Sequence, residues 1–173
     1  MSTSSDSKTV THTLSVLVED KPGVLARVAA LFSRRGFNIQ SLAVGPTELK
    51  NMSRMTIVVT AEETPLEQIT KQLNKLVDVI RLIDLSEGAA IEREIMLIKI
   101  RASGAEQRDE IARLADIYGS RIVDVTDSTY IVEMTGDTAK LDAFVEIIGA
   151  KRILEVVRSG VLGILRGTKA LRA

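Results

Sequence analysis

The sequence predicts an α+β chain built from two successive units, each with the element order β-α-β-β-α-β. Three observations predict this fold class. Apolar residues switch repeatedly between alternating spacing, which is typical of strands, and spacing of three to four, which is typical of helices. Glycine and proline turns separate these segments. The second half of the chain repeats the order of the first, and 173 residues suit two units of roughly 80–90 residues each.

The first predicted unit spans residues 11–88, after a polar lead at residues 1–10 that we expect to be disordered. Alternation predicts its strands and apolar stripes predict its helices. In chain order these are a strand at 12–19, a helix at 24–35, strands at 37–44 and 52–60, a helix that opens at Pro65, and a strand at 79–85. Turn residues bound them, above all Pro22-Gly23, Gly36 and Gly45-Pro46. This order is that of ferredoxin-like domains.

The second predicted unit spans residues 89–173 and has the same ferredoxin-like order. Its segments are strands at 94–102, 121–127, 129–135 and 153–158, with helices at 105–118 and 139–149. A basic tail follows. From Lys151 onward the chain has six Lys or Arg residues and one acid, Glu155. This excess predicts either a solubilising end or a contact with an acidic protein partner.

Each unit is small, and its antiparallel sheet leaves one face and two edges uncovered. A domain of about 80 residues buries only a modest core. Such a domain is commonly stabilised by pairing with another copy, edge to edge or helix to helix. We therefore expect at least a homodimer.

Composition excludes several classes of function. Lys plus Arg and Asp plus Glu both number 23, so no net charge favours nucleic acid or an anionic membrane. There is no cysteine, and His12 is the one histidine, which we expect to be a strand-end residue rather than a ligand. We predict no catalytic residue and no metal ligand. No run approaches the roughly 20 apolar residues of a membrane span, so we expect a cytoplasmic chain.

The turn that precedes the first helix has the residue types of a small binding site. Gly23 has no side chain, so a ligand can approach the backbone N–H groups of Gly23, Val24 and Leu25 at a helix N-terminus, which favours an anion. Asp20 can bind an ammonium group, and Asn38 offers a donor and an acceptor. Together they suit an α-amino acid. The alternative is a plain turn in which Asp20 caps the helix.

These residues also resemble a known family. The stretches Glu19–Leu25 and Phe32–Ile39 are similar to the opening of an ACT domain, a small-molecule sensing module. Further stretches resemble the regulatory small subunit of acetohydroxyacid synthase, also called acetolactate synthase: residues 41–45, 53–58, 72–79, 92–97, 140–144 and 158–161. The resemblance runs from about residue 11 to residue 168.

The resemblance implies a non-catalytic regulatory subunit. In that family the small subunit binds a catalytic large subunit that uses thiamine diphosphate, a divalent metal such as magnesium, and FAD. It raises that subunit's activity and makes it sensitive to feedback inhibition, usually by valine, in branched-chain amino acid synthesis. Two ACT domains pair, and valine binds between them, which maps onto Asp20, Gly23, Val24 and Leu25 of one chain and Asn38 and Ile39 of its partner.

Within this hypothesis Val24, Leu25 and Ile39 form an apolar rim around the valine side chain. Many relatives have Asn at the position of Asp20, and a carboxylate there favours the ammonium end of the ligand. Two rival functions remain open: a free-standing amino-acid-sensing ACT protein that controls another enzyme or transcription, and an enzyme in its own right.

Overall fold

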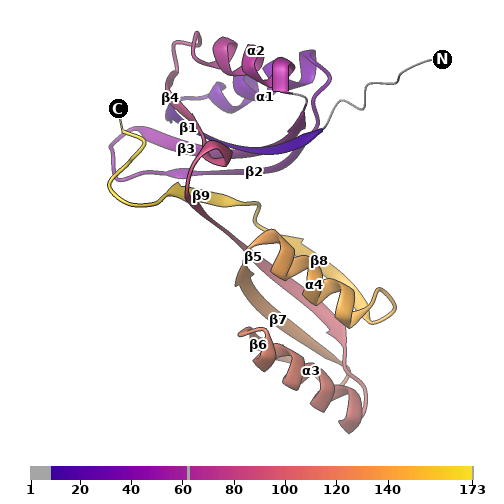
Figure 1. Cartoon of the computed structure of the whole chain (residues 1–173). Coiled ribbons are helices and arrows are strands. Elements are labelled where there is room, and N and C mark those ends of the chain that lie inside the picture. The colour runs from indigo at the N-terminus through magenta and orange to yellow at the C-terminus, as the bar shows by residue number, and fades with distance from the viewer. Residues whose placement is uncertain (1–8, 62, 173) are drawn as a thin grey trace, which may run out of the picture. The chain divides into compact units, whose positions relative to one another are not determined.

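The structure is a computed structural model, shown in Figure 1, that describes residues 9–61 and 63–172. The expected disorder of residues 1–8 lies outside the described residues. Val10, which the sequence places in the lead, is already the first residue of a strand. Internal contacts divide the chain into unit 1, residues 1–91 and 163–173, and unit 2, residues 92–162.

Unit 1 is one antiparallel sheet with two helices on one face (Figure 1). Its strands lie in the order β2-β3-β1-β4, so β1 and β3 are central and β2 and β4 are edges. The elements are β1 (Val10–Glu19), α1 (Val24–Arg34), β2 (Ile39–Pro46), β3 (Met52–Ala61), α2 (Glu63–Leu73), β4 (Val79–Asp84) and the short 3-10 helix η1 (Leu85–Glu87). The predicted β-α-β-β-α-β order is confirmed.

The core of unit 1 follows from the alternation in β1. Leu14, Val16 and Val18 point to the helix side and are fully or almost fully buried. They pack in one cluster with the stripe of α1 formed by Val28 and Phe32. Each such side chain contributes roughly 1.5–3 kcal/mol by leaving water. This packing fixes the direction of α1 and therefore the position of the loop that precedes it.

The C-terminal segment, residues 163–172, packs with unit 1. Leu171 is buried, the Arg166 N–H donates to the Ala89 carbonyl at 2.9 Å, and the Leu165 side chain lies beside Gly88. The sequence predicts this segment as a basic tail of the second domain. The difference arises because its neighbours lie about 80 residues earlier in the chain, and local pattern does not reveal such contacts.

Unit 2 is a second antiparallel sheet, in the order β6-β7-β5-β8, with α3 and α4 against it. The elements are β5 (Ala90–Arg101), α3 (Ala105–Ile117), β6 (Arg121–Val125), β7 (Thr129–Gly136), α4 (Thr138–Ile148) and β8 (Ile153–Arg158), followed by β9 (Leu162–Leu165), whose residues from 163 onward belong to unit 1. β9 pairs with β5 and is absent from the sequence prediction, and β5 begins at Ala90 rather than at Glu94. In the core of unit 2, Met96 and Ile98 of β5 pack in one cluster with Phe144 of α4.

No helix in the described part of the chain is long and apolar enough to cross a membrane.

Candidate functional site

The loop before α1 presents an open helix N-terminus. Gly23 is the N-cap residue, with φ 84° and no side-chain hydrogen bond to the helix. This left-handed conformation is one that residues with side chains rarely adopt. The Val24 N–H donates to the Lys21 carbonyl at 3.4 Å, a long bond, and the first N–H groups of a helix have no acceptor within it. The exposed loop therefore offers partial positive charge to an anion.

Asp20 is held beside this helix end but does not cap it. Its N–H donates to the Asn51 carbonyl at 2.8 Å, which ties the loop to the turn before β3. Asn51 itself has a left-handed backbone, with φ 61°. A cavity of about 410 Å³ lies at this point, lined by Glu19, Asp20, Lys21, Lys50, Asn51 and Met52. The Asp20 side chain is exposed, so its carboxylate can meet an ammonium group.

The charges around Asp20 are partly paired already. Lys21 forms a hydrogen-bonded ion pair with Glu19. The hydrogen bond to Glu19 raises the pKa of the Lys21 ammonium group. Both side chains line the cavity next to Asp20. Because Glu19 already partners Lys21, Asp20 is the carboxylate in the loop that lacks such a pairing among the described residues.

Arg27 is a site residue that the sequence reading misses. Its guanidinium bonds to the Asp78 carboxylate through Nε at 3.0 Å and through Nη2 at 2.6 Å. A Cβ placed on Gly23 would lie 3.1 Å from the Arg27 Nη1 atom. The guanidinium therefore lies against the N-cap glycine through Nη1, which takes no part in the two bonds to Asp78. The sequence gives little indication of this pair. Arg27 lies one turn after Gly23, but Asp78 comes 51 residues after Arg27.

The predicted apolar rim is only partly available to a ligand. The Val24 side chain is buried in the core of unit 1, with an exposure of 3%. Val24 can therefore offer its backbone N–H but not its side chain. Leu25 is 43% exposed and remains accessible. Ile39 is half-buried and packs against the same core.

Asn38 and Ile39 lie at the opposite end of α1 from Gly23. Ile39 begins β2, and Asn38 is the exposed residue just before it. α1 has 11 residues, which corresponds to a length of about 16 Å. One chain therefore brings Asp20, Gly23 and Leu25 together but does not bring Asn38 to them. Asp20, Gly23 and Leu25 on one side and Asn38 on the other all lie at the surface. A second chain could therefore place its Asn38 beside the first group.

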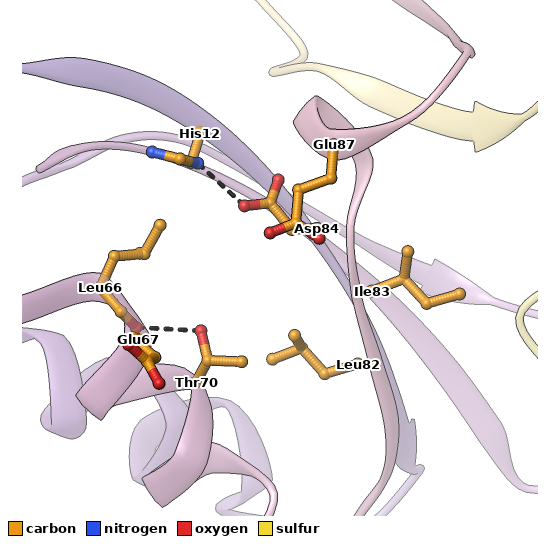
Figure 2. Close-up of a pocket in the computed structure, with 8 residues that line it drawn as sticks. All are labelled: His12, Leu66, Glu67, Thr70, Leu82, Ile83, Asp84 and Glu87. Carbon is orange, nitrogen blue, oxygen red and sulfur yellow. Dashed lines mark hydrogen bonds and ion pairs between the residues drawn. The ribbon is translucent and has the colours of Figure 1, made fainter. Parts of the chain in front are cut away.

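A larger pocket in unit 1 lies away from these residues (Figure 2). It measures about 660 Å³ and is lined by His12, Leu66, Glu67, Thr70, Leu82, Ile83, Asp84 and Glu87. His12 Nδ1 lies 2.8 Å from Asp84 Oδ2, and the other Asp84 oxygen accepts the Ser86 N–H at 2.9 Å. Asp84 thus joins β1 to η1. The three carboxylates of the lining disfavour a ligand carboxylate, so this pocket does not suit an amino acid's acidic end.

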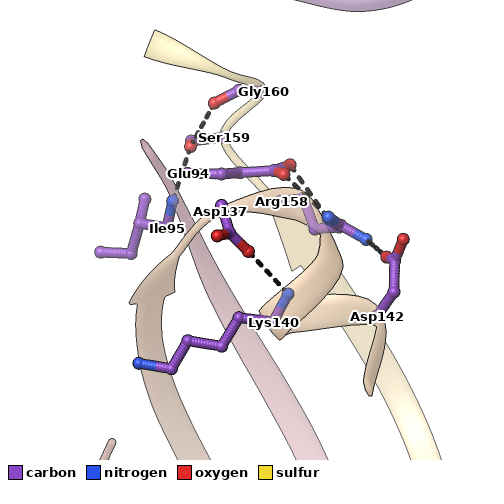
Figure 3. Close-up of polar contacts among 8 residues, drawn as sticks. All are labelled: Glu94, Ile95, Asp137, Lys140, Asp142, Arg158, Ser159 and Gly160. Atoms are coloured by element: carbon purple, nitrogen blue, oxygen red, sulfur yellow. Dashed lines mark hydrogen bonds and ion pairs between the residues drawn. The ribbon is translucent and has the colours of Figure 1, made fainter. Parts of the chain in front are cut away.

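In unit 2 the most buried charge is a structural ion pair (Figure 3). Glu94 is 5% exposed and accepts two hydrogen bonds from Arg158, at 2.9 and 2.8 Å. Arg158 also bonds to Asp142 at 2.6 Å, and its partners raise the pKa of its guanidinium. Ser159 bonds to the backbone of Ile95 in both directions. The Glu94 and Arg158 stretches, far apart in sequence, therefore meet.

Among the described residues, no group of three or more His, Cys, Asp or Glu side chains is arranged to hold a metal ion.

Comparisons with known proteins match two successive parts of the chain to two family descriptions. The family description "AHAS small subunit-like ACT domain" matches residues 14–81, and "Small subunit of acetolactate synthase" matches residues 93–167. The acetolactate synthase small subunit of Mycolicibacterium smegmatis is 53% identical over 165 residues, covering 95% of this chain and 96% of that protein. The isozyme 3 small subunit of Escherichia coli is 53% identical over 160 residues, covering 92% and 98%.

A solved structure extends the likeness to three dimensions. The acetolactate synthase small subunit from Thermotoga maritima superposes with a TM-score of 0.83 at 39% identity, covering 92% of this chain and 99% of that one. The resemblance inferred from the sequence is thereby confirmed, and the chain is similar to regulatory small subunits rather than to the catalytic one. The chain belongs to the family of acetolactate synthase small subunits.

Proposed function

We propose that this chain activates the catalytic subunit of acetolactate synthase and makes it sensitive to valine. The catalytic subunit joins two pyruvate molecules into 2-acetolactate and CO₂, on the route to valine, isoleucine and leucine. We assign thiamine diphosphate, magnesium and FAD to that partner and none of them to this chain. We also assign the complex to the cytoplasm, where valine and the synthase meet.

The observation that carries this proposal is the open N-terminus of α1 next to Asp20. The helix end favours the carboxylate of an amino acid, and Asp20 favours its ammonium group. Leu25 offers an exposed aliphatic surface for a small branched side chain. The Nη1 group of Arg27, which takes no part in the bonds to Asp78, lies next to Gly23 and can donate to that carboxylate. These groups support a valine site within a family of regulatory subunits.

The separation of Asn38 from Gly23 supports a site shared by two chains. A two-fold axis runs paired elements antiparallel. An axis near the middle of α1 and β2 would therefore bring the start of α1 in one chain toward Asn38 of its partner. β2 is an edge strand, and its Val44 side chain is 47% exposed, so this side of unit 1 suits a homodimer. Valine would then stabilise one arrangement of the dimer over another.

The function is tested by measuring acetolactate formation by the purified catalytic subunit with and without this chain. We expect the chain to raise the rate severalfold and valine to reverse that rise. The pure chain with pyruvate, thiamine diphosphate and magnesium should form no acetolactate. Valine binding without any activation would contradict the proposal and favour the free-standing sensor. The match of residues 93–167 to the small subunit supports the regulatory reading over that alternative.

Replacing Asn38 with alanine is expected to weaken valine binding about tenfold, because one charge-assisted hydrogen bond to the ligand is lost. The exposed side chain has no packing role, so the free energy of unfolding should change little. Isothermal titration with valine measures the first effect and urea unfolding the second. Unchanged valine affinity would remove Asn38 from the site.

A further inference from the structure

Unit 2 has a groove on its helix side that none of the residues assigned above occupies. It lies between the end of α3 and one side of α4 and measures about 510 Å³. The lining consists of Leu114, Ile117, Tyr118, Gly119, Lys140 and Ile147. Gly119, two residues after the end of α3, has a left-handed backbone, at φ 63°, and adds no side chain to the lining.

The walls of the groove are aliphatic and unusually exposed. Ile117 is 77% exposed and Ile147 is 48% exposed, and neither side chain belongs to the core of unit 2. Tyr118, which also lines the groove, makes an edge-to-face contact with the buried Phe144, with ring centroids 5.2 Å apart. This contact ties the Tyr118 ring to the core of unit 2. Exposed aliphatic side chains next to such a packed ring are typical of protein interaction sites.

Lys140 gives the groove a charge. Among the described residues that line the groove, Lys140 is the one with a charged side chain. Its backbone N–H is bonded to Asp137 at 2.8 Å, and its stem lies over Gly136, where a Cβ would come within 2.7 Å of the Lys140 Cδ atom. Figure 3 shows the ammonium group directed away from Asp137 and Asp142, and within the described chain it has no ion pair. Lys140 is therefore a positioned, unpaired cation.

We propose that this groove binds a segment of the catalytic subunit that combines an aliphatic side chain with a neighbouring carboxylate. The inference rests on the proposed function. The aliphatic group would lie between Ile117 and Ile147, and the carboxylate would pair with Lys140. A second copy of this chain fits less well, because two grooves facing each other would bring two Lys140 ammonium groups together without a lining carboxylate.

The test compares the full chain with Lys140→Glu and Ile147→Asp as activators of the purified catalytic subunit. Each variant should raise the concentration needed for half-maximal activation by about tenfold, as for a residue near the centre of an interface. The valine concentration that half-inhibits the activated enzyme should stay unchanged. Arg101→Glu is the matched control, since it makes the same charge change at an exposed position of unit 2 outside both the groove and the basic tail.

Two outcomes would overturn the inference. One is half-maximal activation by Lys140→Glu and Ile147→Asp at the wild-type concentration; a loss confined to Val157→Asp, an exposed position on β8 outside the groove, would then place the contact on β8. The other is a change in the oligomeric state of the variants in sedimentation, which would identify a contact between copies. If the wild-type chain itself fails to activate, the proposed function fails, which is a separate result.

Discussion

Gly23→Asp is expected to abolish inhibition by valine while leaving activation of the catalytic subunit intact. The new carboxylate would lie against the N–H groups of α1 and beside Arg27, where a Cβ at this position already comes within 3.1 Å of Nη1. It would occupy the place proposed for the carboxylate of valine. The inhibitory concentration of valine should rise by about a hundredfold or more. Valine titrations of acetolactate formation measure this directly.

Two controls separate charge from strain and from general damage. Gly23→Asn places a side chain of the same shape, without the charge, on a backbone with φ 84°, and should keep part of the inhibition. Gly104→Asp puts the same carboxylate at the N-cap of α3, where nothing lies within 4 Å, and should inhibit like the wild type. Full valine inhibition in Gly23→Asp would place the effector site elsewhere.

Arg158→Met is expected to destabilise unit 2 by about 3 kcal/mol, because it leaves the buried Glu94 carboxylate without its partner. Glu94 is 5% exposed, so water cannot replace the two lost hydrogen bonds. Both tyrosines, Tyr118 and Tyr130, lie in unit 2, and the chain has no tryptophan. Tyrosine fluorescence during urea unfolding therefore reports on unit 2 alone.

Arg121→Met is the matched control for that prediction. Arg121 also pairs with a glutamate, Glu133, but its side chain is 77% exposed. The loss should be much smaller than in Arg158→Met, because solvent screens most surface ion pairs. The double variant Glu94→Gln with Arg158→Met should recover part of the stability, because it removes the unpaired charge. Equal losses in Arg158→Met and Arg121→Met would show that burial of Glu94 does not decide the effect.

Local patterns were sufficient to predict the elements but not the contacts between distant segments. Alternation in β1 and the stripe of α1 predict which faces are buried, and Leu14, Val16 and Phe32 are buried as expected. Turn chemistry likewise places the start of α1 directly after Gly23. Local patterns do not predict where the C-terminal segment and β9 pack, because their positions depend on partners far away in the chain.

The same limit applies to the candidate site. Residue type predicts that Gly23 and Asp20 form one exposed loop, and the structure places both there. It does not predict the Arg27–Asp78 pair, which joins α1 to the segment before β4. It also misplaces the Val24 side chain, since Val24 and Leu25 are equally apolar and only the rotation of the helix buries the first and exposes the second.

The central claim is that two chains share each valine site, and a mixing experiment tests it most directly. Gly23→Asp and Asn38→Ala each impair one half of the site. If the halves come from different chains, mixed dimers contain one intact site, and a random 1:1 mixture should regain roughly a quarter of the wild-type binding capacity. Calorimetry near the wild-type half-saturation concentration measures this. A mixture that binds no more valine than the two separate variants would contradict the shared site.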